Sequence, residues 1–398
     1  MAVNYVANLL SENNMQVDVL TGKPNYPKGK FFKGYGFFSK IVESNNKLNI
    51  YRLPIIPRGR RFRALGLILN YLSAVISFTF LGPIILRNQK YDIIFVYGNS
   101  PLTTAISALF FRYLKKIPVI LWLQDLWPES IKASGYKLFP LLIIFIKKII
   151  NFIYQNVDLI LCQSRSFISH LTKNHEIEKE KIYLLRNTID DIFRKNKEIN
   201  LNLLPDELLK NESSFNILFT GNIGEAQSIE TILGASEEVE RAKKNINFVM
   251  VGGGSKLEIF KKEVLNRGLK KILFLDEHPW ENMPSFINFC DVLLISLNDS
   301  EIFEKTIPNK LQSYLASGKP ILGSLNGESA EIINESNSGI SVESGDSIKL
   351  ARKAILMSEM NKEELKKLGK NGEIYFDENF SKEIFLKQIN IYFNILLK

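Results

Sequence analysis

The chain has 398 residues, of which 45% are hydrophobic and 23% charged, as in a globular protein large enough for two or three domains. Its formal net charge of +9 favours anionic partners, a class that includes nucleic acids, sugar nucleotides and anionic membranes. Cys162 and Cys290 lie far apart in apolar runs, so we expect buried thiols in a reducing compartment. The first residues do not have the pattern of a signal peptide.

The start of the chain is unusual for an α/β domain. Residues 2–10 have the pattern of an amphipathic helix, and residues 17–20 have that of the strand after it. A doubly wound domain normally opens with a strand and a turn before its first helix. We therefore expect the chain to be shortened at its N-terminus, with the first domain lacking its first strand.

A loop with basic and aromatic residues follows the strand at 17–20. Lys23, Asn25 and Tyr26 are the residues of this loop that could contact an acceptor sugar or its pyrophosphate. The prolines and the glycine of the same loop explain the segment equally well as simple turn chemistry. Both interpretations stay open at this point.

Residues 64–86 carry no charge and directly follow Arg58, Arg60, Arg61 and Arg63. A helix of this length reaches about 35 Å, enough to cross a hydrocarbon core of about 30 Å. Polar residues and a proline dilute the segment, so a buried core helix and a helix lying in the membrane surface are the alternatives. We favour the membrane surface, where the arginines would face anionic lipid. A second apolar stretch at 139–154 either extends that surface or forms a core helix.

Short apolar runs alternate with helical segments along the rest of the chain. Such runs are typical of buried strands in parallel sheets joined by right-handed crossovers. The expected strands are 92–97, 119–123, 159–162, 182–185, 217–220, 247–251, 272–275, 292–295 and 320–323. We therefore predict an α/β fold with a first domain at 1–195, a linker around 190–214, a second domain at 214–380 and a final helix within 381–398.

Two carboxylates follow the strand at 119–123, in a turn that also contains Trp127. Asp125 is placed to receive a proton from an acceptor hydroxyl or to orient that hydroxyl. It could instead cap the following helix or close the turn. Glu129 is the alternative carboxylate, and the sequence does not decide between these roles.

Glycine-rich turns follow two strands of the second series. Glycine lets a backbone approach a ligand closely, and a helix after the turn points free N–H groups at that ligand. The candidate ligand contacts in the two turns are Gly221, Asn222, Gly224, Gln227, Gly252 and Gly254. Both turns lack Gly-Lys-Ser/Thr, which argues against an NTPase, and the first also fails the Gly-x-Gly-x-x-Gly fingerprint.

The segment 307–321 has the pattern of a helix start, a short amphipathic helix, a glycine stop and a new strand. Pro308 suits the first turn of a helix, and Gly318 suits its end. A helix N-terminus favours negative charge because of its free N–H groups and its dipole, and Lys310 adds a cation here. Ligands bind at the carboxyl edge of open parallel sheets. With the two glycine turns, this helix start places three anion-binding loops at that edge.

Four motifs of the chain resemble those of family 4 glycosyltransferases. They are residues 21–27 (Thr-Gly-Lys-Pro-Asn-Tyr-Pro), 124–130 (Gln-Asp-Leu-Trp-Pro-Glu-Ser), 221–227 and 308–320, and they extend over nearly the whole chain. The resemblance implies the GT-B fold, in which two Rossmann-like domains face a cleft and a C-terminal helix returns to the first domain. The motifs are similar to those of the bacterial N-acetyl-L-fucosamine transferases of surface polysaccharide synthesis.

The resemblance also implies roles for single residues. The donor-binding set would be Gly221, Asn222, Gly224, Gln227, Gly252, Gly254, Pro308, Asn309, Gln312 and Ser313. The acceptor-binding set would be Lys23, Asn25, Tyr26, Trp127 and Glu129. Asp125, Lys310 and Glu304 would be catalytic, with Lys310 neutralising the donor diphosphate and Glu304 touching a sugar hydroxyl or remaining an exposed loop charge. Many family members have a Glu-x7-Glu signature whose second Glu holds the donor ribose, and that position is Ser313 here.

The implied reaction is transfer with retention of a sugar from a UDP-sugar to a polyprenyl-diphosphate-linked oligosaccharide, in O-antigen, capsule or exopolysaccharide synthesis. We expect an N-acetylated deoxyhexosamine as the sugar, no cofactor, and no metal, because the chain has no Asp-x-Asp motif in a loop. The expected location is cytoplasmic, peripheral on the inner face of the bacterial cell membrane. The alternatives are a UDP-sugar 2-epimerase of related fold and a truncated, non-catalytic membrane-associated scaffold. No nucleic-acid partner is expected, because the basic residues form no stripe interleaved with aromatic residues.

Overall fold

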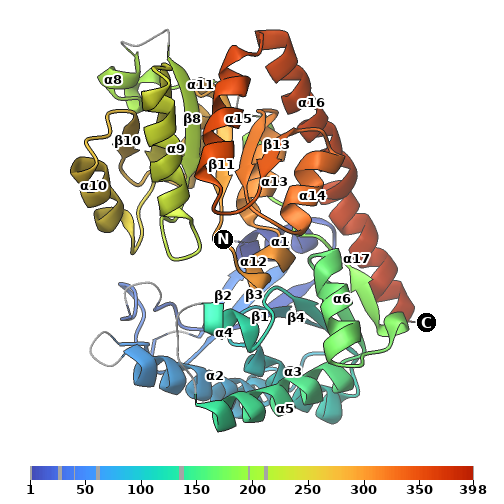
Figure 1. Ribbon diagram of the computed structural model, residues 1–398. Helices are drawn as coiled ribbons and strands as arrows, with labels where there is room; N and C mark the ends of the chain where they lie inside the picture. Colours follow the sequence, from blue (N-terminus) through green and yellow to red (C-terminus); the bar gives the residue numbers. More distant parts are fainter. Residues whose placement is uncertain are drawn as a thin grey trace. The chain divides into compact units, whose positions relative to one another are not determined.

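The computed structural model describes residues 2–25, 29–39, 41–59, 63–133, 139–195, 198–209 and 214–397 (Figure 1). The chain has an α/β architecture and divides into two compact units. Unit 1 comprises Met1–Gln163, Phe167–Leu185 and Leu386–Lys398, and unit 2 comprises Ser164–Ser166 and Arg186–Phe385.

Unit 1 contains a four-stranded parallel sheet in the order β4-β5-β6-β7. Its strands are β4 (Ile94–Gly98), β5 (Val119–Leu123), β6 (Leu159–Cys162) and β7 (Ile182–Leu184). The connections between them contain η1 (Leu102–Thr104), α3 (Ala105–Lys115), α4 (Glu129–Ala133), α5 (Pro140–Asn156), α6 (Arg165–Asn174) and η2 (Lys179–Lys181). β5 and β6 are buried at every position, as expected for central strands of a parallel sheet.

A second, three-stranded sheet of unit 1 was only partly anticipated from the sequence. Helix α1 (Ala2–Glu12) leads into β1 (Val17–Gly22), which pairs in parallel with β3 (Leu48–Leu53), and β2 (Val42–Asn45) pairs with β3 in antiparallel fashion. The predictions omitted β2 and β3, because β2 is mostly polar and Asn49 and Arg52 interrupt the apolar residues of β3. The long helix α2 (Arg63–Ile85) follows this sheet.

Unit 2 is built on a six-stranded parallel sheet in the order β10-β9-β8-β11-β12-β13. Its strands are β8 (Phe215–Thr220), β9 (Ile246–Val251), β10 (Ile272–Leu275), β11 (Val292–Ser296), β12 (Ile321–Ser324) and β13 (Gly339–Val342). The chain moves outward from β8 to β10 and then returns to place β11 on the other side of β8. The strand order therefore reverses between β8 and β11, the place where open α/β sheets bind ligands.

Helices surround this sheet and complete unit 2. They are α7 (Ile192–Lys195), η3 (Leu201–Leu203), α8 (Asp206–Leu209), α9 (Ile229–Arg241), α10 (Leu257–Asn266), η4 (Trp280–Asn282), α11 (Met283–Phe289), α12 (Glu301–Lys305), α13 (Asn309–Ser317), α14 (Glu328–Glu335), α15 (Ser347–Glu359) and α16 (Lys362–Asn379). Successive β8 side chains enter different cores, since Leu218 joins one buried cluster and Ile217 and Phe219 join another. Both faces of the sheet are thus covered, and only its edges are open to a ligand.

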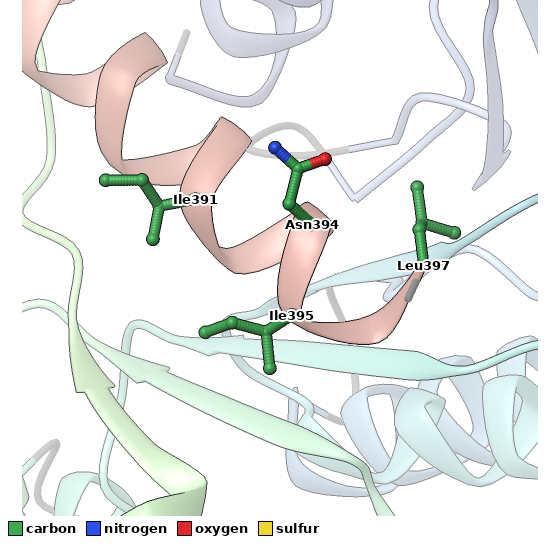
Figure 2. Close-up of a pocket in the computed structure, with 4 residues that line it drawn as sticks. All are labelled: Ile391, Asn394, Ile395 and Leu397. Atoms are coloured by element: carbon green, nitrogen blue, oxygen red, sulfur yellow. The ribbon is translucent and has the colours of Figure 1, made fainter.

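The last helix, α17 (Lys382–Leu396), extends from unit 2 into unit 1. The hydroxyl of Tyr392 donates a hydrogen bond to the carbonyl of Leu184 at 2.7 Å. The ring centroid of Phe393 lies 6.1 Å from that of Phe95. A shallow depression on α17 is lined by Ile391, Asn394, Ile395 and Leu397 (Figure 2). None of these four side chains is ionisable, so this depression has no group for acid–base chemistry.

Candidate functional site

The two glycine turns of unit 2 are joined to each other through their backbones. The N–H of Gly221 donates to the carbonyl of Val251 at 2.8 Å, and the N–H of Ile223 donates to that of Gly253 at 2.7 Å. A Cβ on Gly252 would lie 2.2 Å from the carbonyl oxygen of Gly221, and Gly252 has a φ of +138°. The glycines are therefore required for the turns to meet, and the meeting fixes their main-chain groups beside the carboxyl ends of β8 and β9.

The remaining residues of the first turn are divided between its surface and its interior. Gly221 and Asn222 are exposed, whereas Gly224 is buried. The N–H of Gly224 donates to Oε1 of Gln227 at 2.9 Å, so Gln227 closes the turn before α9. Gly254 resembles Gly252, because its φ is +149° and a Cβ would lie 2.3 Å from the carbonyl oxygen of Ile223. Of the candidate ligand contacts in the two turns, Gly221, Asn222 and Gly254 are exposed.

Helix α13 is attached to the end of β8 by Tyr314. The hydroxyl of Tyr314 accepts a hydrogen bond from the N–H of Thr220 at 3.0 Å and lies 3.2 Å from the Thr220 hydroxyl. Burial raises the pKa of Tyr314 to about 12, so the phenol remains protonated at neutral pH. The helix begins after Pro308 and ends at Gly318 in the left-handed conformation, and both limits agree with the sequence prediction.

Lys310, in the first turn of α13, has a buried ammonium. Its Nζ lies 3.5 Å from the ring centroid of Phe219, and a Cβ on Gly221 would lie 3.1 Å from its Cε. Although the residue as a whole is half-buried, its Nζ is inaccessible and has no hydrogen-bond partner among the described residues. Burial lowers the pKa of Lys310 to about 7. A buried ammonium without a partner is unfavourable, so this position favours an anion.

The other predicted residues near α13 differ in how available they are. Gln312 is buried, and its Oε1 has no hydrogen-bond partner in the described part of the chain. Ser313 is half-buried and its hydroxyl donates back to the carbonyl of Asn309 at 3.2 Å, while Asn309 itself is exposed. Glu304 is half-buried and lies in the last turn of α12. Its backbone packs against Gly327, where a Cβ would lie 2.1 Å from the carbonyl oxygen of Glu304.

A second constellation lies in unit 1, at the carboxyl ends of the adjacent strands β4 and β5. Oδ2 of Asp125 accepts hydrogen bonds from the N–H of Ser100 at 3.1 Å and from its hydroxyl at 2.9 Å. The indole N–H of Trp127 donates to the same hydroxyl at 2.8 Å. Burial raises the pKa of Asp125, and the two hydrogen bonds from Ser100 partly oppose this increase. The site thus holds an oriented carboxylate that is more basic than an exposed aspartate.

Glu129, the alternative carboxylate, has one buried oxygen. Its Oε2 has no hydrogen-bond partner within the described residues, and its charge acts on the buried residues Tyr154 and His175. Burial lowers the pKa of His175 to about 4, so this imidazole is neutral at physiological pH. Glu129 therefore interacts with interior groups, whereas Asp125 is held by Ser100.

The loop after β1 is held together by its own polar side chains. The buried ammonium of Lys23 donates to the carbonyls of Gly36, Phe37 and Ser39 at 2.7, 2.7 and 3.1 Å. Asn25 is also buried, and its side-chain amide donates to the carbonyl of Lys23 at 3.1 Å. These contacts give both residues a structural role in the loop. Tyr26 lies outside the described residues.

Sequence inspection did not identify Phe219 as a member of these sites, and it left Ser100 open between an acceptor contact and simple turn chemistry. Ser100 is 25 positions away from Asp125, and Phe219 reads as an ordinary core residue of a strand. A signal did exist for Ser100, because it follows a strand that neighbours the strand before Asp125. No group of three or more His, Cys, Asp or Glu residues that could hold a metal occurs within the described ranges.

Comparisons with known proteins agree with this architecture. Residues 2–192 match Glycosyltransferase Family 4, and residues 202–374 match Glycosyl transferases group 1. The chain is 24% identical over 320 residues to the glycosyltransferase WbjE of Pseudomonas aeruginosa, with coverage of 78% of this chain and 76% of that protein. It is 23% identical over 320 residues to the colanic acid biosynthesis glycosyl transferase WcaI of Escherichia coli K12, with coverage of 78% and 75%.

Solved structures share the fold at lower identity. Sucrose-phosphate synthase from Thermosynechococcus elongatus superposes with a TM-score of 0.74 at 16% identity, over 99% of this chain and 92% of that one. Anabaena Alr3699/HepE in complex with UDP and glucose superposes with a TM-score of 0.64 at 12% identity, over 96% and 99%. The chain therefore consists of a glycosyltransferase family 4 domain followed by a glycosyl transferases group 1 domain, in the GT-B fold.

Proposed function

We propose that the protein transfers a sugar, with retention, from a UDP-sugar to a lipid-linked oligosaccharide. The observation that carries this proposal is the buried ammonium of Lys310, which lies over the Phe219 ring and has no hydrogen-bond partner among the described residues. It lies in the first turn of α13 and beside the glycine turn after β8, at the point where the strand order of unit 2 reverses. A diphosphate supplies the negative charge that this arrangement lacks.

The leaving group of the reaction is the nucleoside diphosphate. Negative charge accumulates on its oxygens as the bond between the anomeric carbon of the sugar and the diphosphate breaks. Lys310 and the free N–H groups at the start of α13 stabilise this charge. The N–H of Gly221 is bonded to Val251, so this glycine contributes by letting the phosphates approach closely, and the exposed Asn222 beside it completes the contact. Fixed positive groups of this kind do the work that a divalent cation does elsewhere, so we propose a reaction without metal or cofactor. Ser313 and Gln312 are assigned to the nucleoside, and Glu304 to a hydroxyl of the transferred sugar.

On the acceptor side, Asp125 accepts the proton of the attacking hydroxyl or orients that hydroxyl. Its hydrogen bonds from Ser100 hold the carboxylate in place, and its raised pKa improves it as a base. Trp127 positions Ser100, and because its side chain is buried it acts through that serine and not as a sugar-binding surface.

The biological setting is the less direct part of the proposal. The name of WcaI refers to colanic acid biosynthesis, which supports surface polysaccharide synthesis as the context. Anabaena Alr3699/HepE has been solved with UDP-glucose, which supports UDP as the nucleotide. We propose an N-acetylated deoxyhexosamine as the sugar, a polyprenyl diphosphate as the acceptor's lipid, and the inner face of the bacterial cell membrane as the location.

The test is thermal stabilisation of the purified chain by UDP-sugars, UDP, GDP, ADP and dTDP. A ligand at about 100 times its Kd adds about 2.7 kcal/mol to the free energy of unfolding, which is readily detected. We expect stabilisation by UDP compounds in the wild type, its loss in Lys310→Met, and its retention in Lys305→Ala. Lys305 is the matched control, because it lies five positions earlier and its ammonium is paired with Glu301.

Two results would contradict the proposal. Absence of stabilisation by any nucleotide would favour a non-catalytic scaffold. Conversion of a UDP-sugar to its epimer without any acceptor would establish an epimerase instead.

A further inference from the structure

Unit 1 has a helical layer whose outer side is strongly apolar. Helix α3 packs against both α2 and α5, and Figure 1 shows the three helices along one edge of the unit. The exposed apolar residues of α2 repeat every three or four positions, as on one side of a helix. They are Leu65, Ile68, Leu69, Leu72, Ile76, Phe80, Leu81 and Ile84.

Helix α5 and its flank continue the apolar side. Phe139 is 82% exposed, Leu141 81%, Phe145 60% and Phe152 54%. Together with the exposed residues of α2, they form more apolar surface than a soluble protein usually exposes. We call the outer sides of α2 and α5 the lipid-facing layer.

The inner side of α2 is attached to unit 1 along the length of the helix. Near its start, the side-chain amide of Asn70 donates to the carbonyl of Ile56 at 2.6 Å. Further along, the hydroxyls of Thr79 and Ser107 lie 2.9 Å apart, and a Cβ on Gly82 would lie 3.0 Å from a side-chain atom of Phe111. The helix is long and apolar enough to cross a membrane, with 22% of its most apolar window buried. These contacts hold it against the domain, and only its outer side remains for lipid.

The charge of the layer selects among surfaces that could cover it. The sequences of α2, α3 and α5 contain no Asp or Glu. Lys147 and Lys148 are exposed on α5 and lie within one helical turn of Ile144 and Phe145. Apolar side chains with lysines beside them, and no carboxylates, match the interface of an anionic bilayer, where the ammonium groups reach the headgroups.

The layer is also connected to the candidate acceptor site. The ring of Tyr71 on α2 has its centroid 6.2 Å from that of Trp127, whose indole N–H bonds to Ser100. Ser100 in turn donates to Asp125. A lipid-linked acceptor anchored beside α2 would therefore have its sugar end close to the carboxylate.

From these observations we infer that the lipid-facing layer docks unit 1 onto an anionic lipid surface, with α2 lying in the plane of the interface rather than spanning it. This inference rests on the proposed function for its connection to the acceptor. It names the partner surface of the same site.

Vesicle flotation of the full chain tests the inference. We expect the protein to float with equimolar phosphatidylcholine–phosphatidylglycerol vesicles and much less with phosphatidylcholine alone. The double variant Ile76→Ser, Phe80→Ser should lower the partition coefficient at least about tenfold, because two large side chains no longer enter lipid. The matched control is Ile259→Ser, Leu265→Ser on α10 in unit 2, whose side chains are 53% and 80% exposed against 59% and 62% for the test pair.

A charge-reversed pair tests the contribution of the lysines to binding of the anionic surface. Lys147→Glu, Lys148→Glu should lower binding to anionic vesicles about tenfold or more, since each basic residue near an anionic surface contributes appreciably. The control is Lys366→Glu, Lys367→Glu, an equally exposed adjacent pair on α16. Stabilisation by UDP-sugar should be the same in all four variants, so a failure of membrane docking and a failure of the donor site are distinguishable.

Three results would overturn the inference. The first is equal flotation of the test and control variants, or no flotation with either vesicle. The second is a dimer in light scattering that Ile76→Ser, Phe80→Ser dissociates without any vesicle binding, which would make a second copy the occupant. The third is retention in cell membranes after alkaline carbonate extraction, which would indicate that α2 spans the bilayer.

Discussion

The two candidate sites are built in different ways, although both lie at the carboxyl ends of parallel strands. In unit 2, main-chain groups join the turn at Gly221 to the turn at Gly252, and side chains contribute little to that junction. In unit 1, the site depends on side chains, with Asp125 held by Ser100 and Ser100 held by Trp127. A backbone junction suits a ligand group that is the same in every donor, namely a diphosphate. An oriented side chain suits proton chemistry.

The difference has a consequence for how substitutions act. Substitution of a glycine in the unit 2 junction should disrupt its geometry, whereas substitution of other side chains should leave that geometry intact. The unit 1 network is sensitive to a change of a single functional atom. The predictions that follow separate these two sensitivities.

The largest effect is expected from Asp125→Asn. The amide keeps an oxygen for the hydrogen bonds from Ser100 but cannot take up a proton, so transfer should fall by about 10²- to 10⁴-fold. UDP-sugar affinity and unfolding temperature should not change, and Asp92→Asn, at an exposed position, is the control. In the wild type, transfer should decline as the pH falls through the pKa of Asp125, which burial raises from its ordinary value. Parallel loss of stability would assign Asp125 to folding alone.

Gly252→Ala tests the backbone junction of unit 2. The new Cβ would meet the Gly221 carbonyl at 2.2 Å and would require a φ of +138° of an alanine. We expect a loss of about 3–5 kcal/mol in the free energy of unfolding, measured with urea. Gly268→Ala has positive φ but nothing within 4 Å, so it should cost only about 1 kcal/mol. Equal losses in the two variants would mean that the junction is flexible.

The pH dependence of donor binding tests Lys310. In the free site its pKa is about 7, and a bound diphosphate should raise it. Affinity for UDP-sugar should therefore be constant below pH 7 and fall by up to about tenfold per pH unit above it. Calorimetry between pH 6.5 and 9 measures this with a UDP-sugar, whose phosphates do not titrate in the range. Lys310→Met should bind weakly and without the pH dependence; a wild-type affinity that is flat to pH 9 would contradict the assignment.

The same shift has the opposite sign for folding. The folded pKa of Lys310 lies below the value of about 10.4 in an unfolded chain, so the unfolded state binds more protons between these two values. Burial of charged Lys310 thus destabilises the free protein at and below pH 7. Lys310→Met should therefore raise the unfolding temperature at and below pH 7, although it weakens donor binding. This result would show that the buried charge lowers stability and is present for binding.

The smallest effect concerns Ser313. Its hydroxyl donates back to the Asn309 carbonyl, at the position where many relatives of the resembled family have a ribose-binding glutamate. Ser313→Glu should tighten UDP binding about fivefold, the value of one added hydrogen bond of about 1 kcal/mol. The control is Ser358→Glu on α15, because Ser358 is half-buried like Ser313. Unchanged affinity would remove Ser313 from the nucleoside contact.

Much of unit 2 was predictable from sequence. Its strands β8 to β11 are continuous apolar runs between glycine turns, and the helix from Pro308 to Gly318 has explicit start and stop residues. These are local signals, and local signals fix local structure. The position of Lys310 over Phe219 was not predictable, because it depends on how α13 packs on β8.

Unit 1 was harder to predict for related reasons. The strand β2 is mostly polar and β3 is interrupted by Asn49 and Arg52, so neither stands out as an apolar run. Lys23 looked like a ligand contact, yet its ammonium is satisfied by three carbonyls of a loop whose path the sequence does not reveal. Asp125 was identified from its place after a strand, but its partner Ser100 comes from a different strand.

The backbone junction between the turns at Gly221 and Gly252 bears on how this architecture diversifies. Because its bonds run between main-chain groups, most side-chain exchanges around it leave its geometry unchanged. New preferences for one sugar over another can therefore arise by mutation of neighbouring side chains, one at a time, without an intermediate that loses the fold of the turns. The glycines are the positions where evolution has least freedom, and the surrounding shell is where it has most.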